Sequence, residues 1–166
     1  MARVGDVAAQ RLERSVFRMQ MLAATSVLAL TVVTYLFSPI AVTNGLYVTG
    51  LAIIFLATAF AAAVPWARVP HNAIALIPLL DIAAIMFARE GAPAVAASLF
   101  FVFPIFWLAS HFSVWIAVLG PAICSVLLWM SIWWRGEPLT VSNVPTLFVL
   151  PSTFIFLATA AFQAAR

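Results

Sequence analysis

Residues 94–134 read AVAASLFFVFPIFWLASHFSVWIAVLGPAICSVLLWMSIWW, and this stretch of 41 residues carries no formal charge. As one α-helix it would be about 60 Å long, which is twice the hydrocarbon thickness of a bilayer. The stretch therefore has to fold back, and its most polar point is the tetrapeptide 110–113. We expect two membrane-spanning helices here, at about 94–109 and 114–134.

The rest of the chain has the same character. Of its 166 residues, 66% are hydrophobic and 8% are charged, whereas soluble domains are about half apolar and a quarter charged. Breaks that contain proline, glycine or charged residues separate the apolar runs. The sequence predicts an all-α, polytopic bundle of about six transmembrane helices: 19–37, 46–66, 73–88, 94–109, 114–134 and 146–162. Residues 1–18 form an amphipathic or disordered cytoplasmic segment in this interpretation, and 19–166 form the transmembrane domain.

The arginines predict the orientation of the spans. With the N-terminus inside, six arginines fall on the inner side and two on the outer side, and basic residues favour the cytoplasmic side of a membrane. Both termini are therefore expected in the cytoplasm. The inner six are Arg3, Arg11, Arg14, Arg18, Arg68 and Arg166, and the outer two are Arg89 and Arg135.

Several functional classes are excluded or disfavoured by missing residues. The chain has no lysine, so it cannot form a retinal Schiff base, and its single cysteine, Cys124, cannot form an intrachain disulfide. No serine-hydrolase, metalloprotease, Walker or Rossmann motif occurs. His71 and His111 fall at expected turns and show no metal-ligand spacing. We expect no enzyme activity, no metal and no cofactor in this chain, and the scattered arginines do not predict nucleic-acid binding.

Asp81 is the one ionisable residue well inside an expected span. Such residues usually face the interior of a bundle and often mark a pathway or a site. One interpretation gives Asp81 a role in ion movement or signal detection. The other is a neutral Asp81 that bonds to a backbone carbonyl freed by Pro78, or to a serine or threonine on a neighbouring helix.

Four prolines lie inside expected spans, and each removes a backbone hydrogen bond from its helix. They are Pro78, Pro104, Pro121 and Pro151. We expect local kinks at these positions, which could provide hinges or cavities.

Two stretches form a more specific pattern. Arg68 and Pro70 precede IPLLDIAAI at 77–85 and Arg89, and FPIFWLA follows at 103–109. The pattern resembles the N-terminal multi-span membrane-sensor region of actinobacterial signalling proteins, in which helices precede a histidine kinase or a GGDEF-type diguanylate cyclase. The resemblance covers most of the chain. It implies a multi-pass protein of the bacterial inner membrane that forms a homodimer in the lipid bilayer.

The expected function is therefore a membrane-embedded sensory or input module in signal transduction, of the two-component type. It would pass a conformational change to a C-terminal cytoplasmic output domain that is absent from these 166 residues. Two alternatives remain open: a small transporter or channel that uses Asp81, and an accessory or scaffold membrane protein. A reading frame that continues beyond Arg166 into an output domain would favour the sensory module.

Overall fold

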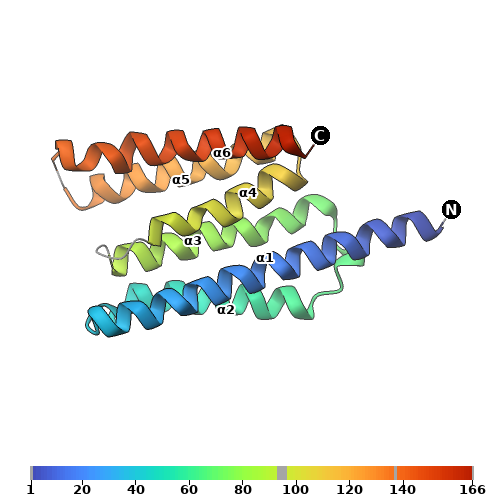
Figure 1. The fold of residues 1–166 in the computed structure, drawn as a ribbon, viewed down its shortest axis with the longest axis horizontal. Coiled ribbons are helices and arrows are strands. Elements are labelled where there is room, and N and C mark those ends of the chain that lie inside the picture. Colours follow the sequence, from blue (N-terminus) through green and yellow to red (C-terminus); the bar gives the residue numbers. More distant parts are fainter. Residues whose placement is uncertain (1, 93–96, 137, 166) are drawn as a thin grey trace. The chain divides into compact units, whose positions relative to one another are not determined.

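The computed structural model describes residues 2–92, 97–136 and 138–165, with the side chains of these residues apart from 2–13, 67 and 142. The α-helices in this part of the chain are α1 (Ala2–Phe37), α2 (Gly45–Ala63), α3 (Leu76–Gly91), α4 (Val102–His111), α5 (Val114–Trp134) and α6 (Leu150–Ala164) (Figure 1). The all-α fold class predicted from the sequence is confirmed for these residues.

Short helical segments of other types lie between the α-helices. Segments η1 (Ala41–Thr43), η2 (Trp66–Arg68), η3 (His71–Ala75), η4 (Ala97–Phe101) and η5 (Val141–Asn143) are 3₁₀-helical, and η6 (Pro145–Val149) is π-helical. The chain divides into two compact units, Met1–Phe100 and Phe101–Arg166. The first unit holds α1, α2 and α3, and the second holds α4, α5 and α6.

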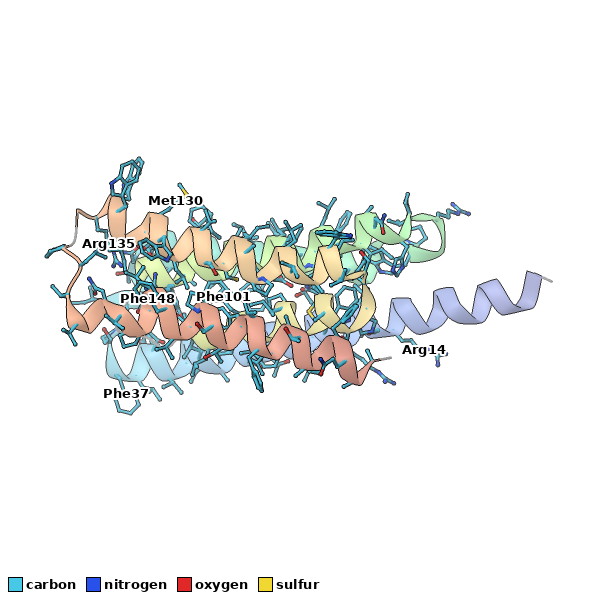
Figure 2. The ribbon with its side chains drawn as sticks, turned by 90° about the horizontal axis from the view of Figure 1, so that it is seen from above. Arg14, Phe37, Phe101, Met130, Arg135 and Phe148 are labelled. Carbon is cyan, nitrogen blue, oxygen red and sulfur yellow. The ribbon has the colours of Figure 1, made fainter. Side chains whose placement is uncertain are left out.

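Helix α1 runs without interruption over 36 residues, which corresponds to a length of about 54 Å. From Asp6 to Phe37 the sequence has neither glycine nor proline. The helix ends before Ser38 and Pro39, because a proline disfavours helical backbone in the residue before it. The composition changes near Met19, where the sequence predicts the first span to begin, but the helix continues through this point. The N-terminal part of α1 extends beyond the ends of α2 and α3 (Figures 1 and 2).

Helix α2 begins at an asparagine cap and packs closely against α3. The Asn44 side chain accepts a hydrogen bond of 2.9 Å from the backbone N–H of Leu46, which satisfies one of the free donors at the helix start. Further along α2, Gly50 lies directly against the α3 backbone between Ala84 and Ala88. Small residues allow two helix backbones to approach closely, which is a common basis of helix association in membranes.

The second unit begins with a helical hairpin. Helix α4 ends at His111 and α5 begins at Val114, so the chain turns where the sequence predicts a turn, at 110–113. Helix α6 packs against both α4 and α5. The rings of Phe101 and Phe154 meet edge to face in this core, with 5.8 Å between their centroids.

Five helical segments of the described chain are long and apolar enough to cross a membrane: Arg14–Phe37, Gly45–Ala63, His71–Gly91, Val114–Trp134 and Pro145–Ala164. Arg14 and Phe37, labelled in Figure 2, mark the two ends of the first of these. The sixth apolar segment, Ala97–His111, is shorter. With 3₁₀ geometry in η4 and α geometry in α4 it is about 25 Å long, slightly less than the hydrocarbon layer of about 30 Å.

The surface of these helices is apolar. Phe37 is 85% exposed and Trp134 is 86% exposed, and many smaller apolar side chains on both units are also exposed. A helical surface with this many exposed apolar side chains is suited to lipid contact. Length, composition and surface together indicate a membrane protein.

We expect Gly50→Ala to lower the free energy of unfolding by about 1–3 kcal/mol. A Cβ atom at position 50 would lie 2.5 Å from the carbonyl oxygen of Ala84 and 2.6 Å from the backbone nitrogen of Ala88. Both are backbone atoms, so α2 and α3 would have to separate. Denaturation of the purified protein in mixed detergent micelles, followed by circular dichroism, measures the loss.

The matched control is Gly45→Ala on the same helix, because a Cβ atom at position 45 meets no atom within 4 Å. We expect this variant to be unchanged, or slightly more stable because alanine favours helix. Equal losses in the two variants would contradict the close packing of α2 on α3.

Candidate functional site

The candidate site is a group of three polar side chains inside the first unit, one from each of its α-helices: Gln20 from α1, Thr58 from α2 and Asp81 from α3. We call these residues the polar triad. Gln20 is 0% exposed and Asp81 is 1% exposed, and Thr58 is partly buried. Of the four buried polar residues in the described part (Gln20, Thr34, Asp81 and Ser131), only Asp81 is ionisable.

Hydrogen bonds connect the polar triad across the three helices. The Gln20 side-chain amide donates from Nε2 to Asp81 Oδ2. Its oxygen, Oε1, lies 3.1 Å from the Thr58 hydroxyl. That hydroxyl also lies 2.8 Å from the backbone oxygen of Ile54, one turn earlier on α2. The second carboxyl oxygen, Asp81 Oδ1, is buried and has no hydrogen-bond partner among the described residues.

The helical periodicity of the sequence explains why these side chains meet. Gln20 belongs to the buried face of α1, in the row Val16, Met19, Gln20, Ala23, Ala24 and Val27. Intervals of three and four residues place such a row along one side of a helix. Asp81 lies in a similar row on α3, between Ile77 and Ile85. A polar residue within each apolar stripe therefore has to find its partner on the neighbouring helix.

A second polar contact links α1 to α2 further along the same interface. The hydroxyls of Thr31 and Tyr47 lie 3.1 Å apart, and Tyr47 is buried. Thr31 also donates to the backbone oxygen of Val27 at 2.8 Å. Helix α1 is thus joined to α2 by side-chain hydrogen bonds at two heights, about 16 Å apart along its axis.

The sequence identified Asp81 but not the residue that bonds to it. The sequence suggests a backbone carbonyl, or a serine or threonine hydroxyl, as the partner of Asp81. In the structure the partner is a glutamine on α1, Gln20. Gln20 is the second residue of the expected first span, where a polar side chain is ordinary at a membrane interface. The sequence did contain one signal: Gln20 is spaced at intervals of three and four residues from the apolar residues that form the buried row of α1.

Three of the four prolines occupy the first turn of an α-helix. Pro78 is the third residue of α3, Pro104 is the third residue of α4, and Pro151 is the second residue of α6. Segments η3, η4 and η6, which are 3₁₀- or π-helical, directly precede these helices. A proline has no N–H to donate to the preceding turn, so the chain can change its helix type there at little cost.

The fourth proline, Pro121, lies inside α5. Its carbonyl oxygen accepts a hydrogen bond of 2.7 Å from the Ser125 hydroxyl. Pro78, Pro104 and Pro151 therefore lie at changes of helix type, whereas α5 continues as an α-helix through Pro121. None of the four prolines contributes a polar atom to the polar triad.

The remaining sequence candidates lie elsewhere. Cys124 is buried in α5. The His111 ring stacks on Trp107, with 4.7 Å between centroids, and its Nδ1 lies 3.1 Å from the Trp107 carbonyl oxygen. His71 begins η3 and is exposed. Within the described ranges, no three histidine, cysteine, aspartate or glutamate side chains lie close enough to hold a metal ion.

Comparison of the chain with protein-family models, with curated proteins and with solved structures found no match. The polar triad and the helices that position it are therefore the basis for a proposed function.

We expect Gln20→Leu to lower the free energy of unfolding by about 1–3 kcal/mol, because it leaves the buried Asp81 carboxyl without its hydrogen-bond partner. Adding Asp81→Leu should restore most of the loss, since an apolar pair of similar size needs no hydrogen bond. Denaturation in micelles measures four proteins: wild type, Gln20→Leu, Asp81→Leu and the double variant.

The control for this pair is Gln163→Leu, which makes the same change at an exposed position of α6. We expect it to have almost no effect. If the double variant is as unstable as the sum of its single changes, then the two side chains are not energetically coupled.

Proposed function

We propose that the chain is a membrane-embedded sensory module of a signalling protein, in which the polar triad sets the position of α1 against α2 and α3. The observation that carries the proposal is the set of hydrogen bonds by which three helices share one buried polar group. A stimulus that alters this group would act on all three helices at once. The resemblance of residues 68–109 to sensor regions supports the same role.

The energetics of the interface suit a switch between two arrangements. Hydrogen bonds between membrane helices contribute about 0.6–2 kcal/mol each, because the separated helices also find other partners. A difference of about 1.4 kcal/mol changes an equilibrium tenfold. Losing or rearranging one or two bonds of the polar triad is therefore enough to change the population of α1 positions substantially.

Helix α1 offers a direct route for the signal. It continues without a break from the polar triad to Ala2, and Arg14 marks the end of its membrane-crossing part. The twelve residues before Arg14 add about 18 Å of helix. A displacement at Gln20 would therefore reach the region outside the membrane through the backbone itself. The resemblance to sensor regions adds a second route, through α6 into a cytoplasmic output domain.

We propose six spans with both termini in the cytoplasm of a bacterium and the protein in its inner membrane, where it forms a homodimer. The arginine distribution of six inside against two outside supports this orientation. The fourth span is the segment Ala97–His111. Its deficit of about 5 Å against the hydrocarbon layer is within the range that local thinning of the bilayer accommodates.

A small proton or ion transporter is the second candidate, and one observation favours it. Asp81 Oδ1 is buried without a partner in the described structure, and an acid in such a position often lies on an ion pathway. In this case Asp81 would bind the transported cation directly. The sensory proposal instead assigns the polar triad to the control of helix position.

The sensory proposal predicts that a change in the polar triad moves α1. We expect Thr58→Val to shift the distribution of distances between spin labels at Leu36 on α1 and Phe87 on α3, both of which are exposed. Wild type should also respond when short-chain lipids replace long-chain lipids in the vesicles, because bilayer thickness acts on span position. Double electron–electron resonance on the Cys124→Ala background measures both effects.

Thr49→Val is the matched control, because the Thr49 hydroxyl bonds to the Gly45 carbonyl oxygen of its own helix at 2.8 Å, just as Thr58 bonds to Ile54. We expect this variant to give the wild-type distances. Identical distributions in all variants and lipids would contradict the proposal. Ion flux in sealed vesicles that Asp81→Asn abolishes would support the transporter.

The topology predicts the location of four connections. Reporter fusions after Asn44 and Glu90 should report the outer side of the membrane, and fusions after His71 and His111 should report the cytoplasm. Alkaline phosphatase activity identifies the first location and green fluorescent protein fluorescence the second. An external signal after both Glu90 and His111 would mean that Ala97–His111 does not cross the membrane, and it would contradict the six-span topology.

A further inference from the structure

The number of protons in the polar triad determines which of its hydrogen bonds can form. The Thr58 hydroxyl has one proton but lies within hydrogen-bonding distance of two acceptors, Ile54 O at 2.8 Å and Gln20 Oε1 at 3.1 Å. It can donate to only one of them. The shorter contact is the one to Ile54, the usual partner of a threonine four residues later in a helix. Gln20 Oε1 is then left without a donor.

The arrangement is equally unfavourable for an ionised Asp81. With the Gln20 amide donating to Oδ2, the negative charge receives one hydrogen bond and Oδ1 receives none. No ion pair with Asp81 occurs in the described structure. A buried carboxylate requires a counter-ion or several donors. The polar triad provides one.

The charged groups of the surrounding elements do not supply the missing partner. Helix α2 (Gly45–Ala63) contains no charged residue, and its Tyr47 hydroxyl bonds to Thr31. On α3 the nearest charged residues are Arg89 and Glu90, two turns from Asp81, and they pair with each other at 2.8 Å. The other described charged or titratable side chains on α1, η2 and η3 are exposed: Arg14, Arg18, Tyr35, Arg68 and His71.

Rotating the Gln20 amide by 180° resolves both problems if Asp81 carries a proton. Oε1 then faces Asp81 and accepts from its Oδ2–H group, while Nε2 faces Thr58 and donates to the hydroxyl oxygen. The Thr58 proton remains on Ile54 O. Every hydroxyl proton and the amide oxygen are now bonded, and the atom without a partner is the carbonyl oxygen of a neutral acid.

We propose that the polar triad is a proton-binding site: Asp81 holds a proton at neutral pH and donates it in a hydrogen bond to Gln20. The proton comes from water and adds to Asp81 Oδ2. When it leaves, the carboxylate requires a donor, so the Gln20 amide turns back: Nε2 donates to Asp81 Oδ2, and the bond from Gln20 to the Thr58 oxygen is lost. The site therefore translates one proton into the orientation of a side chain on α1, whether the protein senses or transports.

Infrared spectroscopy of the full chain in lipid vesicles tests the proposal directly. At neutral pH, wild type should show the carbonyl stretching band of a neutral carboxylic acid, which an ionised carboxylate lacks. Asp81→Asn should remove this band. Glu90→Gln should leave it in place, because Glu90 pairs with Arg89 as a carboxylate.

A second variant keeps the test decisive if Asp81→Asn fails to fold. Gln20→Leu retains Asp81 and removes its partner, so the band should persist at a shifted frequency. The absence of the band from wild type, or its persistence in Asp81→Asn, would overturn the proton site. A band whose frequency is unchanged in Gln20→Leu would overturn the hydrogen bond to Gln20. None of these outcomes depends on whether α1 moves.

Discussion

The structure of the first unit depends on the need to satisfy polar groups where water is absent. In the hydrocarbon layer every backbone donor and acceptor is satisfied within its own helix, and polar side chains have to find partners on the same or adjacent helices. Several threonines and serines of the described helices bond to a carbonyl of their own helix, as Thr34, Thr49 and Ser152 do. Asp81 does not, and its only hydrogen-bond partner in the described structure comes from another helix.

The two interfaces of the first unit are built by different means. Helices α2 and α3 meet through small residues, with Gly50 against the backbone between Ala84 and Ala88. Such packing is close and leaves little room for movement. Helix α1 is joined to this pair by directional hydrogen bonds, at Gln20 and at Thr31. Hydrogen bonds can exchange partners while close packing cannot, so α1 is the element suited to move.

The sequence predicted the helices well because apolar runs interrupted by proline and charged residues have few other solutions in a membrane. It also identified Asp81, since an acid in an apolar run is conspicuous. It did not identify Gln20, because a glutamine near the end of a span is unremarkable until the helix that faces it is known. The continuity of α1 was missed for another reason. The change in composition near Met19 marks where the apolar run begins, but it does not end the helix. The helix continues because the sequence has no glycine or proline there.

The position of Gln20 within α1 has a mechanical consequence. The helix runs from Ala2 to Phe37, so Gln20 is almost at its midpoint, with about 27 Å of helix on either side. If the Thr31–Tyr47 contact is released together with the bonds of Gln20, α1 can tilt about this point as a balanced lever. A tilt of about 10° around this pivot displaces each tip by about 5 Å, in opposite directions, which is close to one helical turn. In the proposed sensory mechanism, a change in the hydrogen bond at this pivot would therefore move both ends of α1 by more than the length of the bond itself.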